Sequence, residues 1–141
     1  VAGEEWDRVI GVNLLGTAAV VRAGLSALGR SKGRVVTVAS SLGLRALPDA
    51  TAYCASKFGV LGFSRALAAE TKGEIGVTTL VPAGMSTAFF DDRDEQYQPG
   101  PDAELNDPAA VADAVVFALD QPPGCEVREL VICHENEPSW P

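Results

Sequence analysis

The sequence is poor in side chains that bind metals or form cross-links. Its three cysteines, Cys54, Cys125 and Cys133, show no C-x-x-C spacing, and His134 is the single histidine. An odd number of scattered cysteines argues against a disulfide framework, and one histidine without nearby partners argues against a zinc site. We therefore expect neither disulfide bonds nor a bound metal.

Positive charge is also scarce. The chain has 11 Lys and Arg against 19 Asp and Glu, a formal net charge of -8 at pH 7. Nucleic acids and anionic membranes are bound by basic clusters, so we expect neither as a partner. No apolar run approaches the roughly 18 residues that span a bilayer, and residues 1–8 do not resemble a signal peptide, which predicts a cytoplasmic protein.

Methionine is almost absent. Met85 is the only one, and the sequence of 141 residues starts at Val1. We therefore expect a fragment or a processed product. With 47% apolar residues, residues 1–141 are expected to form a single partial domain rather than two domains.

Two long segments have the apolar period of a helix. Apolar residues recur mostly every three or four positions through residues 4–28, and residues 51–71 are again expected to be helical. Over residues 14–28 and 53–69 these helices are apolar on nearly every face, and such a helix must be buried on all sides. One face can cover a sheet, and a second copy of the chain is the simplest cover for the other. We therefore expect a homo-oligomer joined through the helices 4–28 and 51–71.

Short β-branched runs alternate with these helices. Asp107 and Pro108 predict the start of a further helix that ends near residue 119, because the carboxylate can cap free amides and proline needs no amide partner there. Strands are expected at residues 34–39, 75–81 and 127–133. The alternation indicates an α/β fold with a parallel sheet, and the run at 34–39 is expected to be a central strand.

A long connection follows the second predicted strand. Residues 82–106 contain three prolines, two glycines and a charged run at 91–95. A loop of this length within a compact domain is usually functional or mobile. The charged run lacks the spaced ligands and central glycine of a calcium loop, which favours a solvated loop tip.

The most informative side chains lie at the start of the second long helix. Tyr53 and Lys57 share a helix face, so the ammonium group can lie near the phenol and lower the phenol's pKa from about 10. A tyrosine with such a pKa can act as a general acid or base. Ser40 follows a predicted strand at the sheet edge where α/β folds bind ligands, and its hydroxyl can hold a carbonyl oxygen. A Tyr-x-x-x-Lys pair also arises as ordinary helix content.

Together with two further motifs, these residues resemble the short-chain dehydrogenase/reductase family over the whole chain. The matching motifs are Asn-x-x-Gly at 13–16, the catalytic Ser40, Tyr53 and Lys57, and Pro-Gly-x-x-x-Thr at 82–87. The resemblance implies about three strands and three main helices of a Rossmann-like doubly wound parallel sheet. Ala83 replaces the usual glycine of the last motif. The family's N-terminal glycine-rich loop, which seats the cofactor pyrophosphate on a helix N-terminus, has no match.

The resemblance implies a role for each matching residue. Tyr53 would exchange a proton with the substrate oxygen, Lys57 would lower its pKa and hold the nicotinamide ribose, and Ser40 would orient the carbonyl. The spacing of thirteen residues before the tyrosine favours Ser40 over Ser41.

Four residues are implied further from the reacting atoms. Asn13 would bind a water that links Lys57 to solvent, and without the family it is equally well a buried amide bonded to a helix backbone. Pro82, Met85 and Thr87 would contact the cofactor, the last two at the nicotinamide carboxamide.

The implied activity is that of an NAD(P)-dependent oxidoreductase. It would interconvert a small-molecule carbonyl and an alcohol by hydride transfer, with NAD or NADP as the cofactor. Residues 82–106 would form the substrate and cofactor loop of the domain. The groups that select between the two cofactors would lie in the unmatched N-terminal part. The alternative is a catalytically silent fragment that acts only as an oligomerising αβ module, and the 141 residues alone are expected to be inactive.

Overall fold

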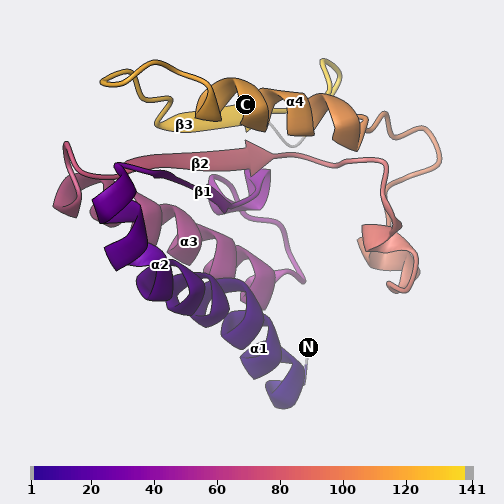
Figure 1. The fold of residues 1–141 in the computed structure, drawn as a ribbon. Coiled ribbons are helices and arrows are strands. Elements are labelled where there is room, and N and C mark those ends of the chain that lie inside the picture. The colour runs from indigo at the N-terminus through magenta and orange to yellow at the C-terminus, as the bar shows by residue number, and fades with distance from the viewer. Residues whose placement is uncertain (1, 139–141) are drawn as a thin grey trace.

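The computed structural model describes residues 2–138 and confirms an α/β fold (Figure 1). The helices are α1 (Gly3–Ile10), η1 (Gly11–Gly16), α2 (Thr17–Ser31), α3 (Thr51–Glu70) and α4 (Pro108–Leu119). The strands are β1 (Arg34–Val38), β2 (Gly76–Pro82) and β3 (Glu129–Ile132), and single turns of 3-10 helix lie at Ser41–Gly43, Ala88–Phe90 and Glu95–Tyr97. Each main helix and strand falls within a few residues of its predicted place.

The three strands form one parallel sheet in the order β1-β2-β3. The central strand β2 is buried at six of its seven residues, as its β-branched sequence requires. Val38 pairs with Leu80 in the β1–β2 ladder, and Leu80 pairs with Leu130 on the other side. The prediction of a central first strand is wrong for residues 2–138, because β2 occupies the centre and β1 has one neighbour.

Helices cover both faces of this sheet. Figure 1 shows α2 and α3 on one side and α4 on the other. Two clusters of small apolar side chains fill the space between α2, α3 and the sheet: Val21, Leu67, Ala68 and Val77, and then Ala39, Val60, Leu61 and Val81. The side chain of Asp107 caps α4 by accepting from the Ala109 amide at 2.9 Å, as predicted from its position before proline.

The segment Gly3–Ser31 is one continuous helix with a π-helical turn, η1, in its middle. It extends past the predicted end near residue 28 and continues to Ser31. Lys32 then adopts a left-handed conformation (φ 50°) that closes the helix. The amide of Gly33 then donates to the Leu28 carbonyl at 2.8 Å. The apolar pattern predicts the helix but not the π turn, which changes only the hydrogen-bond register.

This long helix is more apolar than expected. It contains an 18-residue window of mean hydropathy 1.5, enough by length and composition to cross a membrane, which corrects the expectation that no apolar run approaches that length. A helix in the core of a soluble protein passes the same test. Of its residues only Val21 is buried within residues 2–138, while Val12 and Val20 are 67% and 75% exposed. The chain by itself therefore leaves much of the apolar surface of this helix exposed.

The close contact between this helix and α3 depends on a glycine. A Cβ atom placed on Gly59 would lie 2.7 Å from the Cδ2 atom of Leu14, closer than real Cβ contacts. The same atom on Gly62, one turn further along α3, would meet nothing within 4 Å. The two glycines therefore differ in packing while they share a helix.

We expect Gly59→Ala to lower the free energy of unfolding by about 1–3 kcal/mol, because the added methyl group overpacks the contact with Leu14. Gly62→Ala is the matched control and should raise that free energy by about 0.5–1 kcal/mol, because alanine is the better helix former. Urea unfolding followed by circular dichroism measures both. Equal changes in the two variants would show that the contact is not tight.

Candidate active site

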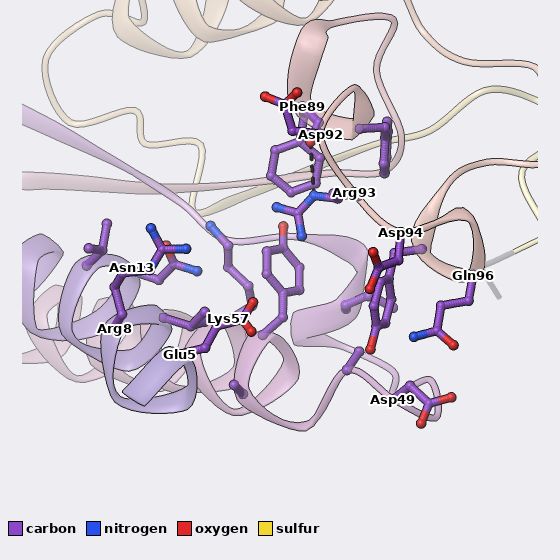
Figure 2. Close-up of a pocket in the computed structure, with 18 residues that line it drawn as sticks. Glu5, Arg8, Asn13, Asp49, Lys57, Phe89, Asp92, Arg93, Asp94 and Gln96 are labelled. Carbon is purple, nitrogen blue, oxygen red and sulfur yellow. Dashed lines mark hydrogen bonds between the residues drawn. The ribbon is translucent and has the colours of Figure 1, made fainter. Parts of the chain in front are cut away.

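A cavity of about 770 Å³ lies between the long helix, the start of α3 and the loop after β2. Asn13, Tyr53 and Lys57 line it from the two helices. Figure 2 shows Asn13 and Lys57 on the helix side and Phe89 and Arg93 on the loop side. Three of the four predicted catalytic residues therefore face one space.

The fourth predicted catalytic residue, Ser40, contacts Tyr53, which lines the cavity. It follows β1, and its Oγ atom accepts from the Leu42 amide at 3.2 Å, which holds the turn after the strand. A hydrogen bond joins the side chains of Ser40 and Tyr53 and lowers the pKa of the phenol. Between the two candidate serines, the structure thus brings Ser40 to the tyrosine, in line with the spacing argument.

Lys57 is oriented by the end of β1. Its Nζ atom donates to the Val38 carbonyl at 3.1 Å and lies 5.6 Å from the centroid of the Tyr53 ring. Burial lowers the pKa of the ammonium group. Ser40 and the carbonyl that holds Lys57 therefore belong to the same strand end.

The pKa of Tyr53 departs from the sequence prediction. It lies above its ordinary value because burial disfavours the phenolate, while the Ser40 hydrogen bond and the charge of Arg93 offset part of that effect. The predicted net lowering of this pKa is wrong for this structure, because burial of the phenol outweighs the groups that favour the phenolate. The phenol is therefore protonated at neutral pH and can donate a proton.

Asn13 lies in the π turn and connects the two helices. Its Nδ2 atom donates to the Oγ atom of Ser56 at 3.1 Å, and Ser56 in turn donates to the Tyr53 carbonyl at 2.7 Å. The partner of the Asn13 amide is therefore a side chain of α3. The sequence analysis missed Ser56, although its position three residues after Tyr53 places it on the neighbouring helix turn.

The three predicted cofactor-binding residues lie at the base of the loop. Pro82 ends β2 and is buried, Met85 forms a parallel bridge with Asn106, and Thr87 accepts from the Phe89 amide at 3.3 Å. The amide of Ser86 donates to the Asn106 carbonyl at 2.8 Å, so the two ends of the loop are tied together. None of the three lines the cavity around Tyr53 within residues 2–138.

Two residues of the loop were given no role of their own by the sequence analysis. The ring centroid of Phe89 lies 6.1 Å from that of Tyr53, and the Arg93 guanidinium carbon lies 4.1 Å from the Phe89 centroid. Arg93 belongs to the charged run assigned to a solvated tip. The one signal in the sequence is that Arg93 is the only basic residue in 82–106.

Known sequences match the chain over most of its length. The pattern of the short chain dehydrogenases matches residues 1–98. An uncharacterized oxidoreductase of Staphylococcus aureus (strain MW2) is 34% identical over 131 residues, which are 92% of this chain and 54% of that protein. The 17-beta-hydroxysteroid dehydrogenase 13 of Rattus norvegicus is 44% identical over 91 residues, 61% of this chain and 30% of that protein.

Solved structures agree on the fold. An alcohol dehydrogenase from the archaeon Thermococcus sibiricus, complexed with 5-hydroxy-NADP, superposes with a TM-score of 0.85 at 24% identity. The match covers 97% of this chain and 57% of that one. The chain therefore spans about half the length of these two nearly fully matched relatives.

We expect Ser40→Ala to raise the pKa of Tyr53 further, because it removes the hydrogen bond that favours the phenolate. Ultraviolet titration in a Tyr97→Phe background leaves Tyr53 as the only phenol to observe, since the chain has two tyrosines. Ser41→Ala is the matched control and should leave the pKa of Tyr53 in place. If only Ser41→Ala shifted the pKa of Tyr53, the hydrogen bond to Tyr53 would belong to Ser41.

Proposed function

Since the chain belongs to the short-chain dehydrogenase family, we propose that it is the C-terminal half of an NAD(P)-dependent oxidoreductase that interconverts a carbonyl and an alcohol. The observation that carries the proposal is the Ser40 hydroxyl bonded to the Tyr53 phenol, with the Lys57 ammonium group over the ring. We assign a small molecule as the substrate and the cytoplasm as the location.

Tyr53 is the proton donor when the carbonyl is reduced. Its raised pKa keeps the phenol protonated at neutral pH, and a positioned proton donor contributes a rate factor of about 10² to 10⁴. The Ser40 hydroxyl holds the substrate oxygen within reach of the phenol as negative charge develops there. The Lys57 ammonium group stabilises the phenolate that remains, and the Asn13–Ser56 contact holds the helix turn of Tyr53.

The donors of Lys57 fit the ribose end of a nicotinamide cofactor. Among residues 2–138 its ammonium group makes one hydrogen bond, to Val38, so two N–H groups remain for ribose hydroxyls. Pro82, Met85 and Thr87 would hold the nicotinamide end from the base of the loop. The bound cofactor, NAD or NADP, supplies or accepts the hydride.

In the whole protein, we expect Tyr53→Phe to lower turnover at least about 100-fold with little change in cofactor affinity, because it removes the proton and keeps the ring. Lys57→Ala should lower both the turnover and the cofactor affinity. Steady-state kinetics and NADH titration separate the two effects. A Tyr53→Phe enzyme with more than about a hundredth of the original rate would contradict the proton-donor role.

A second function is favoured by the exposed apolar face of the helices. Val12, Leu15 and Val20 are more than half exposed on the long helix, and Phe58 is 46% exposed on α3. Burying apolar area stabilises by about 25 cal/mol per Å². We propose that a second copy of the chain covers this face, whether or not the chain also takes part in catalysis.

We expect the 141 residues alone to associate and to lack NADH binding, because the cofactor pyrophosphate would need a glycine-rich turn that they do not contain. Light scattering and calorimetric titration of NADH and NADPH measure the two properties. A clean monomer at micromolar concentration would contradict the self-association. Micromolar binding of NADH would show that the chain carries a complete cofactor site.

A further inference from the structure

Arg93 holds an unusual position within an acidic loop. It stands between Asp92 and Asp94, and all three line the cavity. Among residues 2–138, Arg93 forms no ion pair with either neighbour or with any other carboxylate. Since Arg93 does not pair with the two adjacent aspartates, other contacts orient its side chain.

Those contacts hold the side chain by its stem and its flat face. The Nε atom donates to the Phe89 carbonyl at 2.9 Å, and the guanidinium carbon lies 4.1 Å from the Phe89 ring centroid. The Arg93 carbonyl accepts from the Gln98 side chain at 2.7 Å, which fixes the backbone. Both terminal nitrogens therefore remain free of partners within the described chain, as a preorganised fork that suits an anion.

The fork lies in the cavity of the proposed proton donor. Phe89, on which Arg93 stacks, has its ring centroid 6.1 Å from that of Tyr53. The positive charge of Arg93 lowers the pKa of Tyr53 in part, so its field reaches the phenol. One small molecule can therefore contact both groups.

Building on the proposed function, we propose that Arg93 binds the carboxylate of a small oxo or hydroxy acid whose carbonyl or alcohol lies at Tyr53. A guanidinium fork matches carboxylate and phosphate alike. Four carboxylates line the cavity, Glu5, Asp49, Asp92 and Asp94, against three cations, Arg8, Lys57 and Arg93. The unfavourable interaction of this excess negative charge with a dianion is about twice that with a monoanion, which favours the carboxylate.

A binding experiment on the chain tests this assignment without turnover. The probes are pyruvate, acetoacetate and 4-oxopentanoate, each against its methyl ester, titrated into the isotope-labelled chain and followed by NMR. We expect at least one acid to bind about 10-fold more tightly than its ester. Arg93→Gln should remove that preference, and Arg93→Lys should keep part of it, because lysine retains the charge without the fork.

Gln98→Ala is the matched control for disturbance of the loop. It removes a contact of the Arg93 backbone and keeps the guanidinium group, so the preference for the acid should remain. An equal preference for acid and ester in the original chain would overturn the proposal. The proposal would also be overturned if Gln98→Ala lost the preference for the acid as Arg93→Gln does. Tighter binding of inorganic phosphate than of every acid would overturn it as well.

Kinetics in the whole protein separate this inference from the function on which it rests. We expect Arg93→Gln to lower the acid-to-ester ratio of kcat/KM about 10-fold. If both substrates are reduced and the ratio does not change, Arg93 is not the recognition group and the oxidoreductase stands. If the whole protein reduces no carbonyl with NADH or NADPH, the proposed function fails, and the NMR titration still decides whether Arg93 binds carboxylates.

Discussion

The approach of Leu14 to Gly59 sets the spacing between the long helix and α3, and the candidate site depends on that spacing. Only the missing side chain of Gly59 allows Leu14 to pack against the α3 backbone. At this separation Asn13 reaches Ser56, and Ser56 holds the carbonyl of Tyr53. A small shift between the helices would break the connection to the tyrosine, because hydrogen bonds weaken steeply with distance and angle.

The register of the sheet sets the other side of the site. The Val38 carbonyl holds Lys57, and two residues later Ser40 meets Tyr53. The Ala39 amide donates to the Leu80 carbonyl at 2.8 Å, so the pairing with β2 continues to the point where the polar residues begin. Successive residues of a strand point to opposite faces, and a slip by one residue would turn Ser40 away from α3.

Local features could be predicted from the sequence. The separation of four residues places Tyr53 and Lys57 on one helix face, and Asp107 before Pro108 marks the start of α4, because both patterns act within one or two turns. The packing partner of Gly59 and the stacking of Arg93 on Phe89 depend on tertiary contacts that composition does not encode. The direction of the pKa shift at Tyr53 failed for the same reason, since burial is a property of the folded chain. The edge position of β1 depends on which strands are present. An apolar run has the same sequence pattern at the edge of a parallel sheet as at its centre, so the pattern does not predict the position.

The backbone contacts at the base of the loop allow its sequence and length to change. Met85 and Asn106 bridge, and the Asn106 amide donates to the Gly84 carbonyl at 3.1 Å, so the ends of the excursion are held by backbone groups alone. Such bonds tolerate most side chains at Met85 and Asn106. Each doubling of the length of a flexible loop costs only about 0.6 kcal/mol in closure entropy. Insertions and deletions between the two ends can therefore reshape the cavity wall that carries Phe89 and Arg93 while the sheet and the proton donor stay in place.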